Sequence, residues 1–172
     1  RYPLVTGVQT CALPIYTFLG DARALWNWVD LNANNYVGVG TNVKYYIEKG
    51  GSYNDITPYT NPSGTALAAN PFSTTNGSKI VNVTDGTNSP SIGDYVVFSG
   101  ATAVGGLTIN GEYAVTGKVS STVYQITAAS NATSTATGGG AGVTAYYELA
   151  TGLDVYTVSN GWGAGQWSPT IT

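Results

Sequence analysis

The chain contains no histidine, so the acid–base candidates that we consider first are its carboxylates. A glycosidase needs two carboxyl groups that converge across one sugar. Asp94 and Glu112 are able to approach each other across a small barrel, but nothing in their spacing requires it. Most of the acids border turns, so we predict structural roles for them and no catalytic residue. The acids are Asp21, Asp30, Glu48, Asp55, Asp85, Asp94, Glu112, Glu148 and Asp154.

Short motifs suggest two other kinds of site, and the surrounding sequence supports neither. The glycine-rich runs 38–40, 138–142 and 161–165 have the composition of phosphate-binding loops. None of them precedes a helical pattern or ends in Gly-Lys-Ser/Thr, so turns are the better interpretation. The stretch Thr84–Asn88 has too few acids at alternating positions for a calcium loop. We therefore predict no cofactor and no metal.

Four tryptophans offer a different chemistry, because an exposed Trp is able to stack on a sugar ring or anchor an interface. Trp162 and Trp167, together with Tyr156, are the candidate interaction surface. The alternative, which we favour, is that they pack across a hairpin or into neighbouring domains. Trp26 and Trp28 alternate on one face of a predicted strand, and the same two interpretations apply to them.

Composition limits the classes of partner. Charged residues make up 9% of the chain, against about a quarter in ordinary globular proteins, and the formal net charge is −3. With so few basic residues the chain has no electrostatic footprint for nucleic acid or an anionic membrane surface. It also has no apolar run of transmembrane length. Many Tyr, Thr and Val residues indicate β-structure with a polar, uncharged surface.

Residues 1–15 are predicted to be an artefact. Read codon by codon, Val5–Ile15 resembles the translation of a common short-read sequencing adapter. The only cysteine, Cys11, lies in this stretch, so the remainder has neither cysteine nor histidine, which excludes disulfides, Cys/His zinc sites and His-based triads. Because methionine is also absent, we expect an internal fragment of a larger protein from metagenomic DNA. We expect residues 1–15 to pack poorly.

The chain after this artefact divides into zones. Residues 16–60 are predicted to be β-hairpins of a larger domain. Within them, Asp21–Leu31 is ambiguous: Asp21 is able to cap a helix, but two tryptophans and Val29 favour a strand. Residues 61–72, rich in Pro, Ser, Gly and Ala, are predicted to be a linker.

Two zones follow the predicted linker. Residues 73–150 have regularly spaced strands and turns typical of a small all-β barrel or sandwich. Their low-complexity stretch 128–142 is interpreted as an extended strand followed by a glycine turn where another backbone passes closely. Residues 151–172 are predicted to be a strand and a Gly/Trp-rich turn leading to a missing C-terminal part.

The barrel zone carries paired apolar residues at a period of two, which place both side chains on one face of a strand. The pairs are Val81 and Val83, Val96 and Phe98, Tyr113 and Val115, and Tyr124 and Ile126. The predicted strands are Lys79–Thr84, Asp94–Ser99, Glu112–Thr116, Thr122–Ala128 and Gly142–Leu149.

Four motifs of this zone resemble, in order, a module of bacteriophage virion proteins that is similar to the FCCH domain of ubiquitin-activating enzymes. They are Ile80–Thr84, Ile92–Gly100, Leu107–Val115 and Val123–Ala129. The lead-in 36–58 and the stretch 161–167 are similar to phage tail-associated proteins. Only the small barrel shape is implied by the FCCH likeness, because the ATP loops and catalytic cysteine of those enzymes are absent from the sequence.

The resemblance implies a non-enzymatic, tail-associated structural protein of a phage virion, assembled in the bacterial host cytoplasm. Its expected partners are other virion proteins and further copies of itself, with no nucleic acid and no membrane. The alternative is a host-surface or glycan-binding adhesin module. For the fold, we expect an all-β chain with short antiparallel hairpins followed by a small β-barrel or sandwich.

Overall fold

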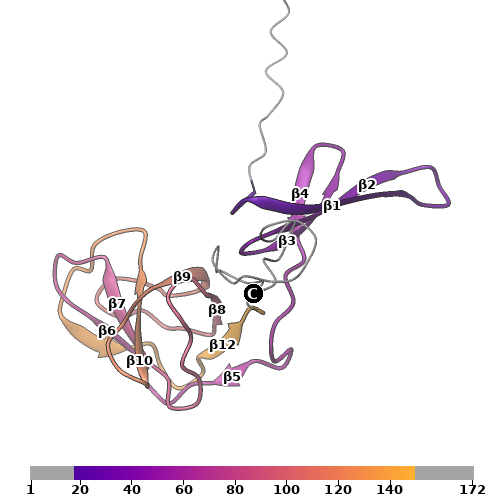
Figure 1. Cartoon of the computed structure of the whole chain (residues 1–172). Helices are drawn as coiled ribbons and strands as arrows, with labels where there is room; N and C mark the ends of the chain where they lie inside the picture. Colours follow the sequence, from indigo (N-terminus) through magenta and orange to yellow (C-terminus); the bar gives the residue numbers. More distant parts are fainter. Residues whose placement is uncertain (1–17, 150–172) are drawn as a thin grey trace, which may run out of the picture. The chain divides into compact units, whose positions relative to one another are not determined.

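The computed structural model describes residues 18–149, and these are all-β, with twelve strands in two antiparallel sheets (Figure 1). The expectation of an all-β chain is confirmed. Two compact units divide between Thr57 and Pro58. Over the part of the chain described here, no helix has the length and hydropathy needed to cross a membrane.

The first unit is a four-stranded meander in which each strand pairs with the next along the chain. Glycines and Asn/Asp turns separate the strands, as the hairpin pattern of the sequence indicates. The strand alternative for Asp21–Leu31 is correct, because β1 runs through it. The strands are β1 (Ala22–Val29), β2 (Asn35–Thr41), β3 (Tyr45–Lys49) and β4 (Ser52–Asp55).

The second unit is an eight-stranded sheet in the order β11-β6-β7-β10-β9-β8-β12-β5. Each predicted barrel strand has its counterpart here, with ends shifted by a few residues. The strands are β5 (Thr65–Ala66), β6 (Phe72–Thr74), β7 (Ile80–Thr84), β8 (Tyr95–Ser99), β9 (Gly111–Lys118), β10 (Val123–Thr127), β11 (Ala136–Gly138) and β12 (Thr144–Tyr147).

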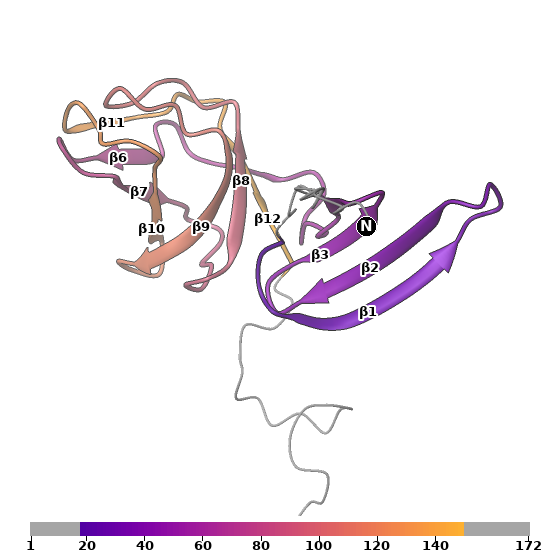
Figure 2. The ribbon, with the colours of Figure 1, turned by 90° about the horizontal axis from the view of Figure 1, so that it is seen from above.

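Strand β9 turns the corner that lets this sheet curl over its own core (Figure 2). Its first half pairs with β8, and its second half pairs with β10. Between these halves Gln125 pairs with Gly117 and Ile126 with Val115, so Thr116 is an extra residue on β9. Such a bulge bends and twists the strand that carries it.

The curled sheet encloses one hydrophobic core, and the apolar pairs of the sequence supply its centre. Phe72 and Phe98 meet edge to face across it, with ring centroids 5.2 Å apart. Each fully buried apolar side chain contributes roughly 1.5–3 kcal/mol. Of the predicted core residues only Tyr113 is half-buried, packing against the cluster from its margin. The others are Val81, Val83, Val96, Phe98, Val115, Tyr124 and Ile126, all with 0–1% exposure.

The low-complexity stretch 128–142 adopts the predicted strand and glycine turn. Strand β11 pairs with β6, and the Gly139 carbonyl then accepts a hydrogen bond from the Thr102 amide at 2.9 Å. Gly139 has a φ of +111°, and a Cβ there would collide with the Phe72 ring. Only glycine permits this backbone to pass so close to the core.

Residues 61–72, expected to be a linker, contribute structure to the second unit. Thr65 and Ala66 form β5 against β12, Leu67 is buried, and Phe72 begins β6 with no exposed surface. Proline, serine and glycine in this stretch make turns between short paired segments, which composition alone does not distinguish from a linker.

Candidate interaction surface

Strand β1 is exposed along its whole length, although it lies in a regular antiparallel ladder with β2. Leu25 is 68% exposed, Trp26 75% and Val29 58%. Because side chains alternate along a strand, Leu25 and Val29 lie on one face of the sheet and Trp26 on the other. An apolar strand with both faces exposed has the composition of a contact surface.

The β1–β2 hairpin extends past the end of β3 (Figure 2). Strand β3 pairs with β2 only from Val37 to Gly40, so the ladder positions Asn35–Val29 and Tyr36–Trp28 lie beyond it. In that outer part each strand has a neighbour on one side only among the described residues. The hairpin tip therefore offers more backbone and side-chain surface than the rest of the sheet.

A turn built on Asp30 closes the hairpin. Its carboxylate accepts hydrogen bonds from the amides of Asn32 and Asn34, at 2.8 and 2.9 Å, and from the Asn34 side chain at 2.7 Å. The Asn34 side-chain bond, followed by its backbone bond, lowers the pKa of Asp30 below the usual value. The turn is thus held by an ionised carboxylate at neutral pH.

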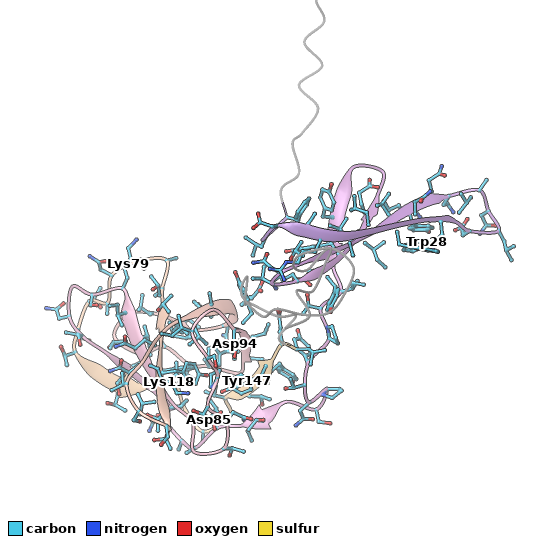
Figure 3. All side chains as sticks on the ribbon, viewed as in Figure 1. Trp28, Lys79, Asp85, Asp94, Lys118 and Tyr147 are labelled. Atoms are coloured by element: carbon cyan, nitrogen blue, oxygen red, sulfur yellow. The ribbon has the colours of Figure 1, made fainter. Side chains whose placement is uncertain are left out.

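An aromatic row, formed by Trp28 and Tyr36 with Lys49 beside them, crosses the Trp26 face of the hairpin. Trp28 is labelled in Figure 3. The rings of Trp28 and Tyr36, which are cross-strand partners, stack at 5.5 Å with planes 14° apart. The Lys49 ammonium lies 5.1 Å from the centroid of the Tyr36 ring, a cation–π distance. Trp28 also leans over Gly38, where a Cβ would come 3.4 Å from its ring.

The opposite face of this sheet carries the small core of the first unit. Val39 and Tyr46 are buried, and Phe18 packs against Tyr46 with ring centroids 6.0 Å apart. Lys44 is buried and its ammonium lies 2.6 Å from an Asp55 carboxylate oxygen. Burial raises the pKa of Asp55, but hydrogen bonds from Lys44 and Thr57 outweigh it, so the net pKa is lowered.

In the second unit a buried polar chain joins Asp85, Tyr147 and Tyr124, with the first two labelled in Figure 3. The Tyr147 hydroxyl donates to Asp85 at 2.6 Å, and the Tyr124 hydroxyl lies 2.8 Å from that of Tyr147. Burial raises the pKa of both tyrosines well above the usual value. Asp85 also accepts the amides of Thr87 and Asn88, at 2.7 and 3.1 Å. Through these bonds Asp85 anchors the loop between β7 and β8, which is a structural role for this carboxylate.

The carboxylate pair considered for catalysis, Asp94 and Glu112, does not converge. In the β8–β9 ladder Asp94 lies opposite Val115. Glu112 is three residues from Val115 along β9, a distance of about 10 Å by the strand rise, and its side chain is on the other face of the sheet. Asp94 accepts the Ser91 amide at 2.7 Å instead. Glu112 does approach Glu148, with carboxylate oxygens within 4.8 Å on the outer face.

The structure brings together residues that the sequence analysis had not joined. Trp28, Tyr36 and Lys49 become one row because β1, β2 and β3 are adjacent in register. A signal for this surface was present: Ala24–Val29 contains no charge and no proline, which is unusual for an edge strand. The predicted surface of Trp162, Trp167 and Tyr156 lies outside the described residues, as do residues 1–15 and Asp154.

Comparison with known proteins gives little. No protein-family profile and no curated protein matches the sequence. A solved structure described as phage phi92 endosialidase aligns at 13% identity with a TM-score of 0.39. The alignment covers 72% of this chain and 27% of that one, so this chain spans about a quarter of the endosialidase. At this TM-score the similarity carries no conclusion about this protein.

Proposed function

We propose that this chain is a non-enzymatic structural component of a bacteriophage virion, associated with the tail. Two features support the proposal. The order of the motifs between Ile80 and Ala129 resembles the FCCH-like module of phage virion proteins. The first unit exposes a long apolar hairpin, which suits a subunit that is covered by neighbours in an assembly.

The exposed β1 strand is the observation that carries this proposal. Leaving apolar surface in water costs roughly 25 cal/mol per Å² relative to covering it. An uncovered edge does not stabilise a monomeric protein, and it also exposes the strand to uncontrolled pairing with other chains. In a particle the same edge contributes to holding subunits together. The expected neighbours are other virion proteins and copies of this chain, assembled in the bacterial host cytoplasm.

The second unit fits a structural role because its polar groups are used for folding. Asp85 and the two tyrosines are buried and joined to each other, and the described glycine turns hold the loops against the core. Such a module is a rigid body that is able to transmit load between neighbours. The FCCH-like identity of residues 73–150 is part of the proposal.

Immunolabelling of particles tests the proposed location. Antibodies raised against peptides from residues 79–99 and 111–127 are applied to phage particles purified from the same source as the gene. We expect gold particles at the tails, with preimmune serum as the control. Labelling confined to bacterial envelopes would instead support an adhesin of the host.

A turnover assay tests the non-enzymatic part. The chain is incubated with host polysaccharide, and released reducing ends are measured beside the Glu112→Gln and Asp94→Asn variants. We expect no release from any of the three proteins. Release that disappears in Glu112→Gln and persists in Asp94→Asn would show a glycan-cleaving enzyme, since Glu112 is the acid of the two with a carboxylate neighbour, Glu148.

A glycan-binding adhesin module is the second candidate, and the aromatic row favours it. Sugar C–H groups stack on the electron-rich faces of Trp and Tyr, and Trp26 is the most exposed of the described tryptophans. A glycan array separates this candidate from the architectural one. Binding lost in Trp26→Ala or Trp162→Ala would establish glycan recognition, whereas an array without signal would leave the architectural role.

A further inference from the structure

From Ala24 to Val29, the outer edge of β1 is an unpaired ladder among the described residues. Strand β1 is the terminal strand of its sheet, so among the described residues only β2 pairs with it. In an antiparallel sheet about half of a strand's N–H and C=O groups point to each side. Those on the outer side of β1 form a template onto which another strand is able to add.

The other three sheet edges of the described chain are protected along their length, whereas β1 is protected only at its start, where the charged Arg23 lies at a β-bulge between Ala22 and Ala24. Strand β4 is short and ends in Asp55, β5 has two residues, and β11 has three and ends in Gly138. Short length, charge and glycine are the usual ways to prevent strands from adding to an edge. Strand β1 has eight residues, and its segment Ala24–Val29 lacks any charge.

We infer that β1 pairs in antiparallel fashion with β1 of a second copy of this chain, joining two four-stranded sheets into one. This inference rests on the proposed structural function and names the partner of the same surface. The contact is isologous: the same strand contributes both sides, and a two-fold axis perpendicular to the sheet passes through its middle.

The charges at the ends of the strand favour a second copy in this orientation. Arg23 lies near the start of β1, and Asp30 follows its last residue. Antiparallel pairing brings the Arg23 end of one copy to the Asp30 end of the other, at both ends of the contact. Parallel pairing would put like charges side by side, which is unfavourable. Within residues 22–30, where Arg23 and Asp30 are the charged residues, this pattern is therefore complementary to itself.

The side chains are complementary in the same way. A two-fold axis perpendicular to the sheet keeps each residue on its own face, so Trp26 and Trp28 meet the same tryptophans of the partner copy. Leu25 and Val29 meet their counterparts on the opposite face. Aromatic and branched pairs across strands contribute roughly 0.2–1 kcal/mol each beyond alanine. The pairing thus covers both exposed faces of the hairpin at once.

The test begins with single-cysteine variants in a Cys11→Ala background, with Cys placed in turn at positions 25, 26, 27 and 28. In a two-fold pair only the residue on the axis lies opposite its own copy, with Cβ atoms about 4.5–5.5 Å apart. We expect one position to give the disulfide-linked dimer in large excess over its neighbours under mild oxidation. Equal and weak linking at all four would overturn the inference.

Light scattering then measures the mass of the unmodified chain. We expect a concentration-dependent species of twice the 17.8 kDa chain mass. The Leu25→Lys variant, which puts a charge on the edge strand, is expected to stay monomeric. Leu31→Lys makes the same change in the exposed turn beyond β1 and is expected to dimerise like the wild type.

Each result separates the inference from the proposed function. A wild type that is monomeric at every concentration, or that associates only after another virion protein is added, overturns self-pairing. Association that survives Leu25→Lys assigns the contact to another surface and also overturns it. Tail labelling of particles is independent of all three results, so the virion role stands or fails separately.

Discussion

The two units use the same antiparallel strands in opposite ways. The eight-stranded sheet curls on itself and buries both Val–Val and aromatic pairs, whereas the four-stranded sheet leaves its first strand exposed on both faces. Burial of apolar surface, and not strand pairing alone, stabilises a sheet. The difference teaches that the second unit buries its apolar strands within itself, while the β1 edge of the first is left exposed, and we infer that a second copy covers it.

The largest predicted effect is in the core of the second unit. Phe72→Ala removes a fully buried ring that packs on Phe98, and we expect a loss of about 3–5 kcal/mol in the free energy of unfolding. This loss in the free energy of unfolding is measured by urea denaturation and, separately, by hydrogen exchange of the β10 amides. Ile80→Ala, on an exposed position of the neighbouring strand, is the matched control and should change little.

The next effect concerns the buried polar chain. Tyr147→Phe removes the hydroxyl that donates to Asp85 and leaves that carboxylate short of a partner, at a cost of about 1–3 kcal/mol. Tyr146→Phe, one residue earlier on the outer face of the same strand, is expected to be close to neutral. Equal losses in the two variants would contradict the special role of the buried hydroxyl.

Alkaline pH should destabilise the second unit through the same tyrosines. Their folded pKa lies above the ordinary value of 10.0, so the unfolded chain releases protons first as pH rises. The stabilisation is present in full below pH 10 and is lost as pH rises above it. Unfolding free energies measured from pH 7 to 11 should fall only in the upper part of this range. A flat profile to pH 11 would show that these hydroxyls titrate normally.

Acid pH should weaken the first unit by a smaller amount. The pKa of Asp55 is lowered, with Lys44 and Thr57 as hydrogen-bond donors, so its contribution is present above the ordinary value of 3.8 and is lost as pH falls below it. Asp55 is partly exposed, which limits the effect through solvent screening. Asp55→Asn should remove this acid sensitivity, measured by exchange of β3 amides between pH 3 and 6.

The smallest effect separates the units most clearly. Leu25→Ala truncates an exposed side chain, and we expect a change of no more than about 0.5 kcal/mol in the stability of the monomer. The same variant should weaken self-association, since the truncated side chain no longer packs against its counterpart in the second copy. Differential scanning calorimetry at low protein concentration checks the first part, and a large loss there would mean that Leu25 is already packed within one chain.

The contrast between units also explains what the sequence could reveal. Period-two pairs such as Val81 and Val83 predicted strands and core because one face of each is buried. The β9 bulge at Thr116 and the pairing of β5 with β12 were not predictable, since both depend on contacts between distant segments. The uncharged, proline-free run Ala24–Val29 was visible in the sequence, but it did not show that β1 is an exposed sheet edge, because an apolar strand is usually covered within its own chain.

The most direct test of the account compares amide exchange in two strands as protein concentration rises. We expect β10, which is paired on both sides, to be protected at every concentration. The outward amides of β1 should exchange freely in the monomer and become protected only as the dimer forms. Protection of β1 that is the same in dilute and concentrated protein would contradict the claim that a second copy completes this edge.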